Sequence, residues 1–199
     1  DLLSKVGASG KPCMSIMNMP PLSFIRRIPG VDAATIRDAY TDPTVWDNVD
    51  PSRITLCSPD PQAFRPPEEK CNVLQVGLPT NFKSARFEGD ADTSILNQIE
   101  QDIQNIRFDA GGNSVELPVK LRVHDSVFVP LAKWCMLLAG NYRCIQAEEM
   151  RPIREAVHSD LGSSESVYNW VADLCVKLGA DPNDLVPFEK YANAALSLK

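Results

Sequence analysis

Short apolar runs, separated by polar and proline-rich stretches, characterise the first 117 residues. Three of these runs have the length of strands and are bounded by Pro, Gly or Asn: residues 12–18, 53–57 and 72–78. A Gly-Gly-Asn turn separates two further apolar stretches, at residues 107–108 and 115–117, which is typical of a hairpin or an edge strand. This pattern predicts an α/β arrangement for residues 1–117.

The clearest helical pattern in this part lies at residues 92–106. Four isoleucines recur there at intervals of three or four residues: Ile95, Ile99, Ile103 and Ile106. Asp92 or Thr93 is a suitable N-cap, so the pattern predicts an amphipathic helix. Residues 58–69 and 77–87 are expected to form surface loops.

After Pro118 the spacing of apolar residues becomes helical. Three or four helices are predicted, over residues 119–138, 150–161, 165–178 and 185–198. Gly140, Gly162 and Gly179 stand where such helices commonly end. The chain as a whole is therefore predicted to be α/β followed by all-α, with a boundary between residues 117 and 118.

Composition and charge limit the kinds of partner that the protein is expected to bind. The 199 residues are 44% hydrophobic and 23% charged, as in folded domains with a core. Twenty Lys and Arg against 26 Asp and Glu give a net charge of -6, so no nucleic-acid partner is expected. The longest uncharged run is shorter than the roughly 20 residues a membrane helix needs, so no membrane partner is expected either.

The six cysteines form no C-x-x-C pair and have no histidines at zinc-finger spacing. Most stand among apolar neighbours, which predicts reduced, buried thiols, no metal site and a cytoplasmic location. The chain starts at Asp1 without a signal peptide and stops within a helical pattern at residues 194–199. We therefore expect it to be a piece of a longer protein.

The segment with the most suggestive chemistry is VKLRVHDSVFVPLAKW, residues 119–134. On a helix Lys120 and His124, four residues apart, share one face. A lysine in apolar surroundings has a lowered pKa, and its ammonium can protonate the alkoxide formed when a ketone is reduced. Lys120 is thus a candidate general acid, and His124 is a candidate for orienting the substrate.

This segment resembles the junction helix of ketopantoate reductases and, more loosely, of the β-hydroxyacid and 6-phosphogluconate dehydrogenase superfamily. In that helix a lysine is followed four residues later by asparagine and then by Pro-Leu. PCMSIMNMPP, residues 12–21, is similar to the strand-then-asparagine segment of the same family. The resemblance implies that Lys120 is catalytic and that Asn18 lies near the nicotinamide of NADP or NAD and near the substrate. It also implies a Rossmann-like domain joined to a helical substrate and dimerisation domain, in a homodimer.

The chain departs from the family pattern in two ways. His124 stands where the family has asparagine, and Pro130 follows Lys120 by one residue more than usual, which makes Asp125 a second candidate for the substrate-binding position. No G-x-G-x-x-G is present. Residues 1–117 are therefore expected to be a partial Rossmann-like domain without its first βα units, and residues 118–199 a helical domain cut short.

Three hypotheses of function follow. The first is an NAD(P)-dependent oxidoreductase that reduces a small 2-oxo acid or ketone, with Lys120 as general acid. The second is an opine-type dehydrogenase in which His124 carries the proton. The third is a non-catalytic helical dimerisation module or degenerate dehydrogenase. In that case Lys120 is simply solvated and Asn18 merely closes a turn before Pro20.

Overall fold

A computed structural model describes residues 2–58, 63–64, 66–70, 73, 75–76 and 80–197. The chain forms two compact units, and each is described by itself. The sheet unit comprises Asp1–Arg27 and Asp32–Pro130, and the helical unit comprises Ile28–Val31 and Leu131–Lys199. A mixed α/β region is thus followed by a helical one. The main division falls after Pro130, whereas the sequence pattern places it after residue 117.

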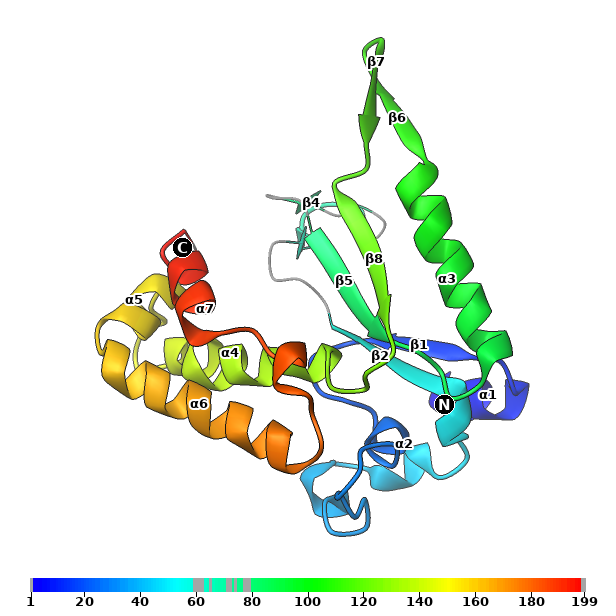
Figure 1. The fold of residues 1–199 in the computed structure, drawn as a ribbon, viewed down its shortest axis with the longest axis horizontal. Coiled ribbons are helices and arrows are strands. Elements are labelled where there is room, and N and C mark those ends of the chain that lie inside the picture. The colour runs from blue at the N-terminus through cyan, green and yellow to red at the C-terminus, as the bar shows by residue number, and fades with distance from the viewer. Residues whose placement is uncertain are drawn as a thin grey trace. The chain divides into compact units, whose positions relative to one another are not determined.

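The sheet unit is built on four strands in the order β1-β2-β5-β8 (Figure 1). β1 (Cys13–Ile16) is parallel to β2 (Ile54–Ser58), and β5 (Thr80–Ala85) is parallel to β8 (Val119–His124). β2 and β5 meet antiparallel. β2 is buried along its whole length, so the core of the unit lies around it. The strands predicted at residues 12–18 and 53–57 are confirmed.

The remaining elements of this unit connect the four strands. Between β1 and β2 lie α2 (Leu22–Ile25) and three short 3-10 helices, η1 (Arg37–Ala39), η2 (Pro43–Trp46) and η3 (Pro51–Arg53), while α1 (Leu2–Ser9) precedes β1. The two-residue strands β3 (Ala63–Phe64) and β4 (Gln75–Val76) pair with each other. Of the strand predicted at residues 72–78, the structure shows β4, and residues 72, 74 and 77–78 lie outside the described part.

The connection from β5 to β8 contains the predicted helix and hairpin. α3 (Asp90–Asn105) is followed by β6 (Arg107–Ala110) and β7 (Asn113–Glu116), which pair antiparallel around Gly111 and Gly112. Both glycines have positive φ angles, of 65° and 90°, which side chains with a Cβ rarely adopt. The prediction for residues 92–117 is therefore confirmed in type, with shifts of a few residues at the ends.

Residues 119–124 form a strand, so the helix predicted over residues 119–138 is wrong in its first half. Val119, Leu121 and Val123 alternate with charged or polar residues, and this period of two is that of a strand. β8 pairs with β5 over all six residues. The helical part, α4 (Lys133–Ala139), begins only after the 3-10 turn η4 (Pro130–Ala132). The loop expected at residues 77–87 is also wrong, because Thr80–Ala85 is the strand that pairs with β8.

The isoleucines of α3 do not face the core of the sheet unit. Ile95 and Ile99 are 50% and 40% exposed, whereas Leu96 is buried. The helix faces β8 instead through Glu100, whose carboxylate accepts hydrogen bonds from the Val123 backbone N–H (3.0 Å) and the Arg122 guanidinium (3.2 Å). β8 is an edge strand of the sheet. Glu100 therefore provides an acceptor for a backbone N–H that no neighbouring strand bonds.

The helical unit contains α4, α5 (Ile153–His158), α6 (Leu161–Lys177), α7 (Phe188–Ala195) and two 3-10 turns, η5 (Asn141–Cys144) and η6 (Pro182–Asp184). The helices predicted after residue 149 are thus confirmed in type and approximate position.

Tyr168 lies at the centre of the core of the helical unit, with ring centroids of Phe188 and Tyr191 each 5.4 Å away. Its hydroxyl donates to the Val186 carbonyl at 2.7 Å, and the Tyr191 hydroxyl donates to the Met136 carbonyl at 3.1 Å.

Gly140, at the end of α4, leaves the space that the Tyr191 hydroxyl occupies. A Cβ on residue 140 would overlap that hydroxyl and lie 3.2 Å from the Met136 carbonyl oxygen. We expect Gly140→Ala to reduce the free energy of unfolding by about 1–3 kcal/mol, the usual cost of overpacking. Gly162→Ala is the matched control, since its Cβ would meet only an Asp160 oxygen at 3.9 Å. Equal melting temperatures of the two variants, followed by circular dichroism, would contradict the prediction.

Glu100 gives a second test of this packing. Glu100→Ala leaves the Val123 N–H and Arg122 without their acceptor, so we expect a loss of about 1–3 kcal/mol in the free energy of unfolding by urea. Glu100→Gln keeps an acceptor oxygen and is expected to lose less. Gln101→Ala, at the next and exposed position of α3, serves as the control and is expected to unfold like the parent chain. An unfolding midpoint of Glu100→Ala equal to that of the control contradicts this account.

Candidate functional site

Lys120, the candidate general acid, lies near the start of β8 rather than on a helix. Its side chain is 16% exposed, and its amine stands 3.1 Å from a carboxylate oxygen of Glu116. The hydrogen bond from Lys120 is the main reason why the pKa of Glu116 is lowered. The amine is therefore held by a carboxylate and not by apolar surroundings alone.

Lys120 and His124 share one face of β8, but the strand separates them more widely than a helix would. Four residues span about 13 Å in a strand and about 6 Å in a helix. The Lys120 amine is also held at Glu116, which precedes the strand, whereas His124 ends it. The structure thus places the two candidate groups toward opposite ends of β8.

Asn18 and Asp125 lie apart from Lys120 as well. Asn18 follows β1, and β1 and β8 are separated by β2 and β5, which corresponds to about 14 Å across the sheet. Asp125 directly follows β8, its side chain is 98% exposed, and its carboxylate is 3.7 Å from the Arg86 guanidinium. Of the four predicted site residues, only His124 and Asp125 are brought together.

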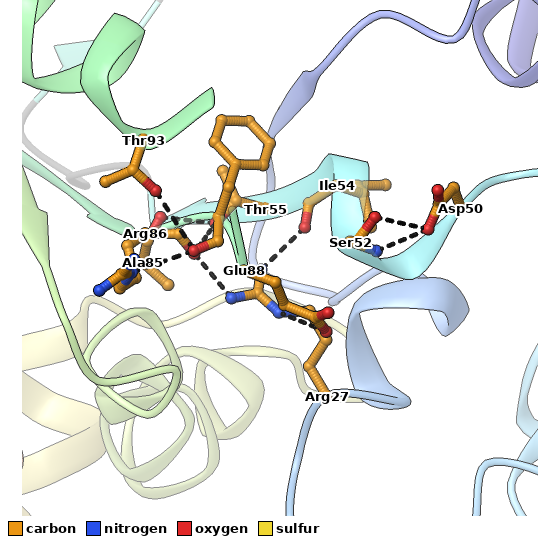
Figure 2. Close-up of polar contacts among 10 residues, drawn as sticks. Arg27, Asp50, Ser52, Ile54, Thr55, Ala85, Arg86, Glu88 and Thr93 are labelled. Carbon is orange, nitrogen blue, oxygen red and sulfur yellow. Dashed lines mark hydrogen bonds and ion pairs between the residues drawn. The ribbon is translucent and has the colours of Figure 1, made fainter. Parts of the chain in front are cut away.

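A buried polar cluster of the sheet unit surrounds Arg27, which follows α2 (Figure 2). Its side chain is only 4% exposed. The guanidinium donates one hydrogen bond to the Ile54 carbonyl at 2.9 Å and another to the Arg86 carbonyl at 2.7 Å. Burial lowers the pKa of Arg27, and Glu88, 3.7 Å away, works against that shift. Arg27 thereby joins the first residue of β2 to the residue that follows β5.

Two threonines add to this contact between β2 and the residues that follow β5, which we call the seam. The Thr55 hydroxyl of β2 donates to the Ala85 carbonyl of β5 at 2.6 Å. The Thr93 hydroxyl of α3 donates to the Gly89 carbonyl at 2.8 Å and also lies 3.3 Å from the Phe87 carbonyl. The backbone between β5 and α3 is therefore held from both sides by side chains of other elements.

The outer part of this cluster is charged. The Arg86 guanidinium is 31% exposed, pairs with Asp90 and lies near Asp125. Arg53 pairs with Asp92 at 3.5 Å. Because α3 begins with Asp90 and Asp92, the partial positive charge of its N-terminus already faces carboxylates, and a phosphate is disfavoured there.

The carboxyl end of β5 and β8 is one candidate place for ligand contacts. Ala85 and His124 are paired at the carboxyl ends of the parallel strands β5 and β8, and the Arg86 N–H donates to the His124 carbonyl at 2.8 Å. The carboxyl ends of parallel strands are where open α/β sheets bind their ligands. The Arg86 guanidinium at this end is 31% exposed and already faces the carboxylates of Asp90 and Asp125, and Nε2 of His124 is buried.

The buried cysteines do not supply a nucleophile. Burial raises the pKa of Cys57 and of Cys135 to about 12, so both are thiols at neutral pH. Within the described ranges, no three His, Cys, Asp or Glu side chains gather where a metal ion could be held. No helix in the described part of the chain has the length and apolar character to cross a membrane.

The sequence pattern singles out neither Arg27 nor Thr55, and it places Arg86 in the expected surface loop of residues 77–87. The available signal was weak: Arg27 closely follows the wholly buried helix α2, Leu22–Ile25, and an arginine so placed needs acceptors in the interior. The acceptors themselves are backbone carbonyls 27 and 59 residues farther along the chain. No local pattern of side chains predicts these acceptors.

Arg27→Lys tests the seam. A lysine ammonium is a point charge and lacks the planar fork that reaches both carbonyls at once. We expect a loss of about 2 kcal/mol in the free energy of unfolding. Arg37→Lys is the matched control because Arg37 forms an ion pair with Asp47 at the surface, and such pairs contribute about 0–1 kcal/mol. The interpretation fails if the two variants unfold at the same urea concentration.

Comparison of the chain with protein-family models, with curated proteins and with solved structures finds no match. Any function therefore has to be argued from the residues and their geometry. The geometry brings together His124, Asp125 and Arg86 at one end of β5 and β8, and sets Lys120 with Glu116 at the other end of β8.

Proposed function

We propose that this chain is part of an NAD(P)-dependent oxidoreductase resembling ketopantoate reductase, which reduces a small 2-oxo acid or ketone. The observation that carries the proposal is the order of the architecture. A β5–α3–β8 unit with parallel strands belongs to a mixed sheet, and a helical unit follows it from Leu131 onward. Reductases of the kind that the sequence resembles have this order of a nucleotide domain and a helical domain, which is support at the level of fold.

In this proposal Lys120 acts as the general acid. Its side chain is mostly buried and its amine is held by Glu116, so it would be positioned before the substrate binds. An ammonium beside the carbonyl oxygen stabilises the developing alkoxide and then gives it a proton. Asn18 would contribute on the nicotinamide side, and His124 or Asp125 would contact the substrate.

The described residues do not fit the pyrophosphate of such a cofactor. The sequence has no glycine-rich cradle, and the first turn of α3 carries Asp90 and Asp92. The proposal therefore assigns to these residues only the protonation and orientation of the substrate, and the hydride chemistry belongs to the nicotinamide.

Lys133 is a second candidate for the acid. In the resembling family the lysine lies on the junction helix, but Lys120 lies on a strand, and the helix that opens the helical unit begins at Lys133. Against Lys133 stands its context, because Pro130 and Leu131 precede it, whereas Pro-Leu follows the family's lysine. The two lysines can be separated by substitution.

A second function is favoured by the carboxyl end of β8. His124 and Arg86 lie together there, which suits an opine-type dehydrogenase with a histidine acid and carboxylate substrates. Such an enzyme would lose turnover in His124→Asn, and its pH profile would follow a group that titrates near neutrality. A non-catalytic module would neither bind nor oxidise NAD(P)H.

The test compares Lys120→Ala, Lys133→Ala and Lys190→Ala, the last an exposed control on α7. Oxidation of NADPH and NADH would be followed with a panel of 2-oxo acids, in the full-length protein. We expect Lys120→Ala to lower kcat by about 10²–10⁴, the usual contribution of a general acid, with cofactor affinity unchanged. Unchanged turnover in Lys120→Ala would remove Lys120 from the mechanism, and loss only in Lys133→Ala would transfer the role to Lys133.

A further inference from the structure

The helical unit has an open groove beside α6, with a volume of about 350 Å³. One wall is the face of α6 that presents Asn169, Ala172, Asp173 and Val176, and the other wall is formed by residues 182–188. All the residues that line the groove belong to the helical unit, and none of them is a candidate catalytic residue of the proposed oxidoreductase. Small-molecule sites in proteins are concave and have volumes of about 300–1,000 Å³, so the groove is large enough for a small ligand.

Tyr168 fixes the second wall of the groove to the first. Its hydroxyl donates to the Val186 carbonyl at 2.7 Å, and its ring centroid is 5.4 Å from that of Phe188. Gly179 has a φ angle of 112°, which lets the chain turn back after α6 (Figure 1), and the Asp181 carboxylate caps η6. The groove is therefore formed before a ligand arrives, so binding requires little ordering of the chain.

Asp173 is the one charged residue among those that line the groove, all of which the structure describes. Its carboxylate has no hydrogen-bond or ion-pair partner in the part of the chain that the structure describes. Asn169 stands four residues before Asp173, so the two side chains share one face of α6. Residues 165–190, which include both walls, contain five Asp and Glu against two Lys, a net charge of -3. The groove thus combines an apolar surface with an uncompensated negative charge.

We propose that this groove binds a small organic amine, that is, an ammonium group on an apolar body. The ammonium would donate hydrogen bonds to the Asp173 carboxylate and to the amide oxygen of Asn169, since a primary ammonium has three donors. The apolar body would cover Val176, Leu185 and Pro187 in the two walls. An anionic ligand would meet the carboxylate with a like charge, and a neutral apolar ligand would desolvate it without compensation.

The probe is 2-phenylethylamine, which is protonated at neutral pH. Two reference compounds keep the phenyl body and change the polar group: 2-phenylethanol has a neutral hydroxyl, and 3-phenylpropionate has a carboxylate. Each compound is titrated into the ¹⁵N-labelled full chain, and the amide signals are followed by NMR. We expect the amine to shift signals from both walls of the groove with a dissociation constant of about 1 mM, typical of a ligand of this size. Both reference compounds are expected to bind at least about tenfold more weakly.

Variants of the chain assign the binding to this groove. Asp173→Asn removes the charge and keeps the shape, so we expect it to weaken binding of the amine by about tenfold. Glu165→Gln is the matched control, because Glu165 is also an exposed carboxylate of α6 but does not line the groove. Ala172→Phe would fill the groove and is expected to abolish binding. Asp173 and Glu165 are exposed, so neither substitution should change the melting temperature.

Four results would overturn the proposal. The first is the absence of saturable shifts with the amine, and the second is equal binding of the amine and the alcohol. The third is undiminished binding of the amine by Asp173→Asn. The fourth is a doubling of the mass of the chain in light scattering that Ala172→Phe abolishes, because a second copy would then be the occupant of the groove.

Discussion

The contact on which the sheet unit depends most is the pair of hydrogen bonds from Arg27 to the carbonyls of Ile54 and Arg86. β1 with β2, and β5 with β8, are two parallel pairs that meet only where β2 lies antiparallel to β5. In the described residues that ladder consists of Cys57 with Ser84 and Ser58 with Lys83. Beyond it, Arg27 donates hydrogen bonds to the Ile54 and Arg86 carbonyls, and Thr55 donates one to the Ala85 carbonyl. The seam between the two pairs is thus closed by side chains.

An arginine suits this position because its guanidinium presents several donors in one plane. Burying a charge is costly unless it is hydrogen-bonded or paired: Arg27 donates hydrogen bonds to two carbonyls, and its Nε, which makes no hydrogen bond to the described residues, lies 3.7 Å from the carboxylate of Glu88. Glu88 is 53% exposed, so it offsets the charge without being buried itself. A hydrophobic side chain of similar size would fill the space but leave the two carbonyls without donors.

The same seam positions the candidate groups at the carboxyl end of β5. Arg27, Thr55 and Thr93 hold the backbone between β5 and α3, and this leaves Arg86 directed to the carboxyl end of β5 beside His124 and Asp125. Lys120 and Glu116 belong to the other end of β8. The two enzyme hypotheses therefore correspond to two different ends of one strand, which is why single substitutions can distinguish them.

Local pattern was sufficient to predict several elements. The helix at α3, the hairpin with Gly111 and Gly112, the strands β1 and β2 and the helices after Met150 all show a clear period or turn signal within about 15 residues. At β8 the local pattern fits a helix in one respect and a strand in another. Residues four apart share a face in a helix and also in a strand, so the spacing of Lys120 and His124 fitted both, while the alternation of Val119, Leu121 and Val123 fitted only a strand.

The order of a mixed α/β part and a helical part, and most of the local elements, can be predicted from the sequence because they follow from propensity and periodicity over short stretches. The buried face of α3 cannot be predicted in this way, because Glu100 contacts an edge strand that begins 19 residues later. The hydrogen bonds from Arg27 to the carbonyls of Ile54 and Arg86 are likewise seen only in the folded chain. The same holds for the placement of Asn18 and Lys120 at opposite edges of the sheet. These features depend on backbone groups brought together from distant parts of the chain, and such groups leave no mark in the local pattern of side chains.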